Sequence, residues 1–394
     1  MSTGKVRVMI VDDSAVVRRL LAQALSGHPE IEIVGTAANG AIALSKIASL
    51  NPEAIILDIE MPEMDGITML GHLRETHPRL PVIMFSTLTE RGASVTFDAL
   101  AAGASDYVLK PSTQHGESLE GVVRNTLVPK LIALTRSRFA LATQAALAQL
   151  EPIKNPFAAP PITASLRAPA PKLRPSMPTT PAKRSMVPIA RKPVRVIGIA
   201  ASTGGPNALA AVIERLPAQL PVPIVIVQHM PPIFTRTLAE RLAARAALKV
   251  RESEGGELLE PGCVYIAPGN RHMEAVREGE QVRLTLHDGP PENSVRPSAD
   301  VLFRSLNQSY AGGVLAVVLT GMGQDGVRGA RELAQAGGRV LAQSGPTCVV
   351  WGMPKAVEEA GIADAIVPLP EMASAILQRV GTGLLPTRRP EGER

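Results

Sequence analysis

Short apolar runs and amphipathic stretches alternate along the first part of the chain. Between the apolar runs, hydrophobic residues recur at helical spacing, as in Ala41–Leu50. Five runs have the length and composition of buried strands: Val6–Val11, Ile31–Thr36, Ala54–Leu57, Pro81–Phe85 and Asp106–Leu109. Strands that alternate with helices predict a parallel, doubly wound α/β sheet of flavodoxin-like type.

The same pattern returns after residue 193. An apolar run from Val194 stops abruptly at Ser202-Thr-Gly-Gly-Pro206, which predicts a buried strand, a glycine turn and a helix N-terminus. Further strands are expected at 222–228, Val264–Ala267, Val282–Thr285, Gly313–Leu319 and Arg339–Ala342. Helices are expected up to Leu216, at Phe234–Ala246 and at Val301–Leu306, with two more that finish near Val380. The prediction is a second doubly wound, largely parallel α/β domain, here Rossmann-like.

A proline-rich segment separates the two patterns. Residues 119–150 continue helically, but Glu151–Pro193 holds eleven prolines, which helix interiors and central strands do not accept. We therefore expect an extended tether and four parts: a first domain at 5–123, a helical extension and Pro-rich linker at 124–193, a second domain at 194–380 and a tail at 381–394. Two folded domains on such a tether favour regulation by docking and release.

The charge of +5 is concentrated in this linker. Glu151–Pro193 has eight Lys or Arg against one Glu, a net +7, so the remainder of the chain carries −2. Neither folded domain is basic, and no helix-turn-helix pattern is present, so we expect no nucleic-acid partner. Two cysteines, no apolar run of membrane-spanning length and no signal-peptide pattern predict a cytoplasmic protein without direct membrane insertion.

Polar residues follow the predicted strands of the first domain. The carboxyl ends of parallel strands meet at one edge of the sheet. That rule gathers five side chains there: Asp12, Asp13, Asp58, Ser86 and Lys110. Converging carboxylates repel one another unless a hard cation sits among them, and Mg²⁺ prefers oxygen ligands. The nearby lysine suits a transferred phosphoryl group.

In the second domain the same rule brings together Ser202, His229 and Asp325. A serine nucleophile needs a base to accept its proton, and the base needs an acid that orients it. Other candidates for the base are His272 and His287, which follow short segments that look antiparallel. Other candidates for the acid are Asp288 and Asp300. Ser202 and Asp325 also have ordinary interpretations as residues that cap helices.

Two common templates do not fit the turn at Ser202. The nucleophile elbow G-x-S-x-G needs glycine where Ala200 stands, and its triad order is Ser, Asp, His rather than Ser, His, Asp. The dinucleotide fingerprint G-x-G-x-x-G fails at the same alanine, and Gln228-His229 replaces the acid expected at the next strand end. A nucleotide-dependent oxidoreductase is therefore disfavoured.

The first domain resembles a two-component receiver domain over residues 5–123. The resemblance is carried by Asp12-Asp13, the lone Asp58, Ser86 and Tyr107-x-x-Lys110-Pro111. It implies that a histidine kinase phosphorylates Asp58. It also implies that Asp13 and Asp58, supported by Asp12 and the Glu60 carbonyl, hold Mg²⁺. Ser86 and Lys110 would bind the phosphoryl group, while Tyr107 would change rotamer with Ser86 or serve only in packing.

The second domain resembles the chemotaxis protein-glutamate methylesterases, the CheB family. The resemblance is carried by Ser202-Thr-Gly-Gly-Pro, Gln228-His229-Met-Pro, Tyr265-Ile-Ala-Pro-Gly, Arg296-Pro-Ser-Ala-Asp and Thr320-Gly-Met-Gly-x-Asp-Gly. It implies that Ser202 attacks the γ-methyl ester of a glutamate in a methyl-accepting chemoreceptor, with His229 as base and Asp325 as its partner. It also implies deamidation of receptor glutamines, an oxyanion site at backbone N–H groups near Met322 and Thr203, and no cofactor for the esterase chemistry. The chain departs from the family at Ala200, usually glycine, and in its long linker.

The leading interpretation is thus a phosphorylation-activated serine hydrolase in a chemosensory two-component pathway. In the resting state the first domain would cover the Ser202 edge. A competing hypothesis is a response regulator whose second domain is a binding or scaffolding module with a vestigial triad, against which the complete Ser/His/Asp set argues.

Overall fold

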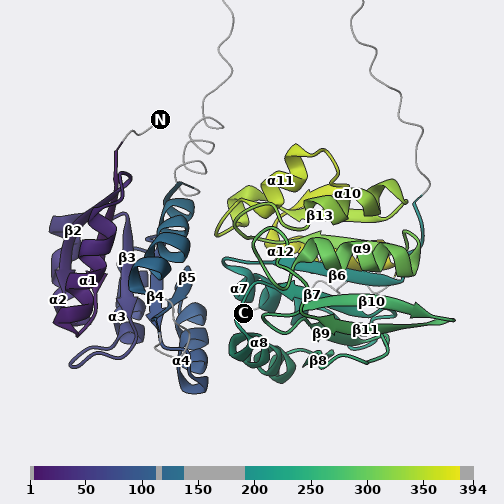
Figure 1. Cartoon of the computed structure of the whole chain (residues 1–394), viewed down its shortest axis with the longest axis horizontal. Coiled ribbons are helices and arrows are strands. Elements are labelled where there is room, and N and C mark those ends of the chain that lie inside the picture. The colour runs from purple at the N-terminus through teal and green to yellow at the C-terminus, as the bar shows by residue number, and fades with distance from the viewer. Residues whose placement is uncertain (1–3, 112–117, 137–190, 382–394) are drawn as a thin grey trace, which may run out of the picture.

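The computed structural model describes residues 4–111, 118–136 and 191–381, which form two α/β units (Figure 1). The N-terminal unit holds a five-stranded parallel sheet in the order β2-β1-β3-β4-β5. Its strands are β1 (Val6–Val11), β2 (Ile31–Ala37), β3 (Ala54–Asp58), β4 (Val82–Ser86) and β5 (Asp106–Leu109). Its helices are α1 (Ala15–Ser26), α2 (Gly40–Leu50), α3 (Gly66–Thr76), α4 (Glu90–Ala101) and α5 (Leu119–Val122).

The C-terminal unit is built on a seven-stranded parallel sheet in the order β14-β13-β12-β6-β7-β9-β8. Its strands are β6 (Val196–Ala201), β7 (Ile224–Gln228), β8 (Lys249–Glu252), β9 (Cys263–Ile266), β12 (Val314–Val318), β13 (Arg339–Gln343) and β14 (Ala365–Val367). A separate antiparallel hairpin pairs β10 (His272–Glu278) with β11 (Gln281–His287).

Helices follow most of these strands, as the doubly wound prediction requires. They are α7 (Gly205–Ile213), α8 (Pro232–Arg245), α9 (Ala299–Tyr310), α10 (Val327–Gln335), α11 (Met353–Glu359) and α12 (Leu369–Val380). The predicted fold class, two parallel α/β domains, is therefore confirmed. The Pro-rich linker lies outside the described residues.

Differences from the sequence prediction lie in the short and polar elements. No predicted strand corresponds to β8, β10 or β14. The sequences of β8 (Lys-Val-Arg-Glu) and β10 are largely polar, and β14 has three residues at the edge of the sheet. The helical stretch after Leu119 passes through a π-helical turn at Val123–Leu127 and stays helical to residue 136. The continuation predicted to residue 150 lies outside the described residues.

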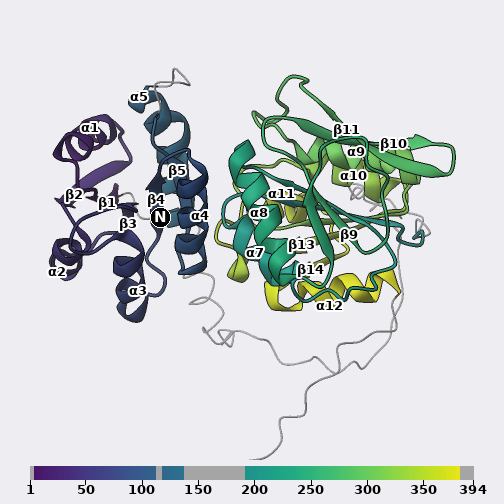
Figure 2. The same cartoon turned by 90° about the horizontal axis from the view of Figure 1, so that it is seen from below.

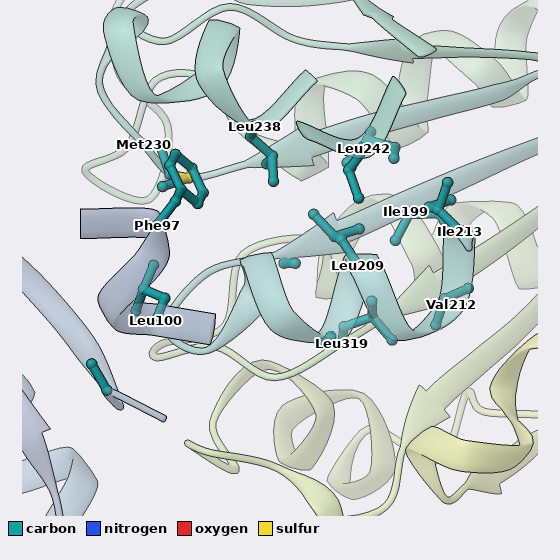
Figure 3. Packing of buried hydrophobic residues seen from close by; sticks show 14 of the residues in the cluster. Phe97, Leu100, Ile199, Leu209, Val212, Ile213, Met230, Leu238, Leu242 and Leu319 are labelled. Carbon is teal, nitrogen blue, oxygen red and sulfur yellow. The ribbon is translucent and has the colours of Figure 1, made fainter. Parts of the chain in front are cut away.

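Aliphatic side chains build most of the cores, since aromatic residues make up only 3% of the chain. The central strands β6, β7 and β12 are buried along their whole length. One apolar cluster continues from the C-terminal unit into the N-terminal unit, and Figure 3 shows Phe97 and Leu100 of α4 beside side chains of the second unit. The two units thus share buried surface.

The contact is made by α4, which packs against α7 and α8 (Figure 2). Tyr107 of β5 stacks on Phe234 of α8 with ring centroids 4.4 Å apart. Arg241 of α8 lies over the ring of Phe97 and pairs with Asp98 at 2.7 Å. Stacked rings and a guanidinium over an aromatic face add specificity to the apolar burial.

None of the helices in the described ranges combines the length and the hydrophobicity that a bilayer crossing requires.

We predict that Gly205→Ala destabilises the C-terminal unit. A Cβ at Gly205 would lie 1.9 Å from Gln228 Oε1 and 2.9 Å from Ala201 Cβ, so the buried Gln228 side chain, which bonds the Ser202 carbonyl, would have to move. Overpacking of this kind lowers the free energy of unfolding by about 1–3 kcal/mol, measured by thermal or urea denaturation. The control is Gly71→Ala in α3, where a Cβ meets no atom within 4 Å. There, the higher helix propensity of alanine should raise the free energy of unfolding by about 0.5–1 kcal/mol. Equal effects of the two substitutions would contradict this prediction.

Candidate active site

Three carboxylates gather at the carboxyl ends of β1 and β3. Asp12, Asp13 and Asp58 each offer an oxygen, and these oxygens all lie within 4.8 Å of one another. Asp12 and Asp58 are buried, whereas Asp13 is exposed. Lys110, directly after β5, places its Nζ 3.1 Å from Asp12 Oδ2 and 2.7 Å from Asp58 Oδ2. The structure therefore brings four of the five predicted residues of this edge together.

One lysine does not balance this charge. Burial raises the pKa of Asp58 to about 6, and the Asp12 carboxylate adds to the rise although Lys110 opposes it. A divalent cation with oxygen ligands would favour the ionised form of the cluster. An open cleft of about 440 Å³ beside the cluster, lined in part by Asp13, Glu60 and Arg91, leaves access from solvent. These residues fit Mg²⁺.

The remaining residues predicted for this edge have other partners in the structure. Ser86 ends β4, and its hydroxyl accepts a hydrogen bond from Thr96 Oγ1 at 2.7 Å. The Glu60 side chain points to solvent, 3.8 Å from Arg91. Tyr107 is buried against Phe234 of the other unit, so its packing function links this edge to the C-terminal unit.

The second site is set by the register of β6 and β7. Ala201 and Gln228 are paired at the ends of these strands, so Ser202 and His229 leave the sheet at adjacent positions. The His229 N–H donates to the Ala201 carbonyl at 3.2 Å, and the Ser202 N–H donates to the Thr320 carbonyl at 3.0 Å. The loop after β12 is thereby tied to the Ser202 turn.

That loop carries Asp325, which accepts a hydrogen bond from His229 Nε2 at 2.9 Å. Oδ2 also accepts from the Ala299 N–H, and Oδ1 accepts from the Ser298 hydroxyl, the Asp300 N–H and Asn293 Nδ2. Burial alone would raise the pKa of Asp325, but the hydrogen bond and charge of His229, together with hydrogen bonds from Ser298 and the Ala299 N–H, lower it to about 2. A buried carboxylate with so low a pKa is ionised at neutral pH and can orient the imidazole through the hydrogen bond to Nε2.

With Nε2 bonded to Asp325, Nδ1 is the other ring nitrogen of His229, and among the residues that the structure describes it makes no hydrogen bond, either to Ser202 or to another group. Ser202 is half-buried, and within the described residues its hydroxyl makes no hydrogen bond. Gly321 lets the neighbouring loop pass close by, since a Cβ there would lie 2.8 Å from Ser202 Cβ. Over the described part of the chain, the backbone N–H groups of Thr203 and Met322 have no hydrogen-bond acceptor. Thr203 directly follows Ser202, and Met322 directly follows Gly321, the residue that approaches Ser202.

The other candidates for base and acid have different partners. His272 is buried, donates from Nε2 to the Pro290 carbonyl at 3.0 Å and accepts from the Ser298 N–H at Nδ1. The prediction that antiparallel segments precede both histidines is wrong for His272, because the strand before it, β9, is parallel to β7 and β8, and His272 itself begins β10. His287 does end the antiparallel strand β11, where it faces Glu274. Asp288 pairs with Arg271, and Asp300 accepts from the Gly329 N–H. Among these candidates, only His229 and Asp325 share a hydrogen bond.

Sequence reasoning missed several groups that hold the site. Ser298 lies in the Arg296–Asp300 motif, but its hydrogen bond to Asp325 had no separate signal. Asp106 was expected only as part of a strand. In the structure Asp106 Oδ2 accepts from Thr203 Oγ1 at 2.8 Å and pairs with Lys130 at 2.7 Å. The residue beside Ser202 is thus bonded to the N-terminal unit.

Each of the two units matches a known protein family. Residues 197–376 match the family model of the CheB methylesterase, and residues 8–118 match that of the response regulator receiver domain. A protein-glutamate methylesterase/protein-glutamine glutaminase of Trichodesmium erythraeum is 44% identical over 378 residues, covering 96% of this chain and 99% of that protein.

A protein of the same name from Nocardioides sp. is 47% identical over 377 residues, covering 95% of both chains. The crystal structure of the Thermotoga maritima CheB methylesterase catalytic domain is 42% identical. It covers 47% of this chain and 98% of its own, with a TM-score of 0.46.

Proposed function

The chain belongs to the CheB methylesterase family and carries a response regulator receiver domain before its methylesterase domain, and from this premise we propose how its residues act. Its function is to remove methyl esters from glutamate side chains, and to deamidate glutamines, in chemosensory adaptation. We propose receptors of the methyl-accepting type as substrates, a histidine kinase as phosphodonor and a cytoplasmic location. We also propose a receiver domain at 5–123, a linker at 124–193, a methylesterase domain at 194–380 and a tail at 381–394.

Ser202 is the proposed nucleophile, His229 the base and Asp325 the partner that orients His229. Ser202 Oγ attacks the γ-carbonyl carbon of the ester, and its proton passes to His229 Nδ1. Methoxide leaves with that proton as methanol, which produces the acyl-enzyme. A water molecule then attacks the acyl carbon, gives its proton to His229 and releases the glutamate carboxylate, while Ser202 regains a proton. With glutamine the leaving group is ammonia.

The 2.9 Å bond between His229 and Asp325 is the observation that carries this assignment. Because the Asp325 carboxylate stays ionised, it stabilises the imidazolium that forms when His229 takes the Ser202 proton. The Thr203 and Met322 N–H groups are the proposed donors to the oxyanion, where charge develops in the transition state.

In the receiver domain, Asp58 is the proposed phosphoryl acceptor. Asp12, Asp13 and Asp58, with the Glu60 carbonyl, would hold Mg²⁺, which supplies charge neutralisation for the phosphoryl group. Lys110 and Ser86 would bind that group, and Tyr107 would respond together with Ser86. The esterase chemistry as proposed uses protein groups alone.

The contact between the two domains supports a restraint on the resting enzyme. The Thr203–Asp106 hydrogen bond ends one residue from Ser202, and Tyr107 lies against α8. Both receiver residues belong to β5, which leads directly into Lys110. We propose that phosphorylation of Asp58 repositions Ser86 and Tyr107, weakens this contact and opens the Ser202 edge to receptors.

Ser202→Ala should reduce methanol release from methylated receptor membranes by at least about a thousandfold, because no other group replaces the nucleophile. A fluorophosphonate should label the native wild-type chain at Ser202 and leave the variant and the unfolded wild type unlabelled. Wild-type activity in the variant would exclude the triad. A wild-type chain that neither reacts nor is labelled would favour the scaffolding alternative.

Asp58→Asn should abolish phosphorylation by a small-molecule phosphodonor, because the buried carboxylate is the acceptor. Removal of Mg²⁺ with a chelator should have the same effect, because the reaction needs a cation. Intact-protein mass spectrometry measures the adduct, and the methanol assay measures the lost activation. The control is Asp65→Asn, since asparagine is an equally good N-cap for α3. Phosphorylation that persists in Asp58→Asn would refute the assignment.

Arg241→Ala should raise the basal esterase rate about 1.4- to fivefold, since a partly exposed ion pair contributes about 0.2–1 kcal/mol to the closed contact. Arg241 donates to the Ser94 carbonyl and to Asp98 across the interface. The matched control, Arg245→Ala on the same helix, breaks only a pair with Glu214 inside the methylesterase domain. If the contact is autoinhibitory, phosphorylation should increase the esterase rate of Arg241→Ala by a smaller factor than that of the control. A basal rate of Arg241→Ala equal to that of the wild type would argue against autoinhibition.

A further inference from the structure

A tight turn lies beside the Asp325 carboxylate. Asn293 and Ser294 have left-handed backbone angles, φ 55° and 64°, and the N–H and carbonyl groups of Glu292 and Val295 bond to each other at 3.1 and 3.0 Å. These are the features of a type I′ turn, for which asparagine is a preferred first central residue. The turn fixes the direction in which the Asn293 side chain projects.

An ion pair fastens this turn to α9. The Arg304 guanidinium donates to both carboxylate oxygens of Glu292, at 2.7 and 2.6 Å. The first N–H groups of the same helix, those of Ala299 and Asp300, donate to Asp325. The turn and the Asp325 carboxylate are therefore both held by one rigid element.

Asn293 Nδ2 bridges two buried carboxylates. It lies 2.7 Å from Asp325 Oδ1 and 2.9 Å from Asp300 Oδ2. Both aspartates are at most 3% exposed, so water does not screen their repulsion. Burial raises the pKa of Asp300, and the charge of Asp325 adds to this rise. One amide nitrogen has two N–H groups, which is the number that this bridge requires.

We propose that Asn293 is a positioning residue for the esterase reaction. It holds the Asp325 carboxylate in line with His229 Nε2 and separates its charge from that of Asp300. Asn293 acts through Asp325 and does not touch Ser202 or His229 in this role. The inference rests on the proposed triad, and it assigns a reaction-specific function to a residue outside it.

The test uses the full-length chain, with the phosphodonor present, in the methanol-release assay. Asn293→Gly keeps the left-handed turn and removes the amide. We expect kcat to fall about tenfold to a hundredfold, which is the cost of leaving a buried charged group without one donor. KM for methylated receptor should stay unchanged, and the rate of fluorophosphonate labelling should fall by a similar factor.

Ser294→Gly is the matched control, because Ser294 shares the left-handed turn and its side chain is exposed. We expect it to retain the wild-type kcat. Adding Asp300→Asn to Asn293→Gly removes the neighbouring charge and should recover at least about threefold of the lost kcat. Thermal midpoints establish that each variant is folded.

The inference is overturned if Asn293→Gly keeps kcat within twofold of wild type, if KM changes in place of kcat, or if Asp300→Asn gives no recovery. Ser202→Ala, measured in the same series, distinguishes an error in the triad from an error in the role of Asn293. Activity retained in Ser202→Ala means that the triad itself is wrong. Activity lost in Ser202→Ala but kept in Asn293→Gly means that only the role of Asn293 is wrong.

Discussion

Parallel pairing of β6 with β7 and β12 is the constraint on which the methylesterase domain depends. The pairing ends all three strands at one edge, so Ser202, His229 and the Thr320–Asp325 loop leave the sheet beside one another. The strands are buried along their whole length, and a shift of register by one residue would move every side chain to the opposite face. Packing of the aliphatic core therefore fixes where the reactive groups emerge.

The buried negative charge of Asp325, behind Ser202 and His229, is stabilised by hydrogen bonds rather than by solvent. Asp325 collects donors from His229, from the start of α9 and from Ser298, and its pKa falls to about 2 despite burial. In the receiver domain, burial outweighs the stabilising contacts of the carboxylate. Asp58 is buried with Asp12 beside it, and one lysine leaves its pKa near 6. The first arrangement keeps Asp325 ionised at neutral pH, whereas the second leaves the charge of the Asp12–Asp58 pair only partly compensated by Lys110.

The two sites are joined by few elements. Strand β5 carries Asp106 and Tyr107 into the domain contact and ends beside Lys110 of the acidic cluster. Helix α4 lies between the cleft beside that cluster, which Val95 helps to line, and helices α7 and α8. The acidic cluster and the turn at Ser202 are therefore connected by packed side chains and one hydrogen bond, and the proposed restraint would act through these contacts.

The sequence by itself determined the two α/β domains and the edges at which their chemistry gathers, because β-branched runs mark parallel strands and polar residues mark their ends. It also singled out Ser202, His229 and Asp325. It left His272, His287, Asp288 and Asp300 as open alternatives, and only the tertiary structure showed which histidine and which aspartate share a bond. Asp106 against Thr203, and Asn293 between two carboxylates, had no signal in the pattern. Such contacts join residues far apart in the chain or on different elements, and their partners are set by packing in three dimensions rather than by local spacing.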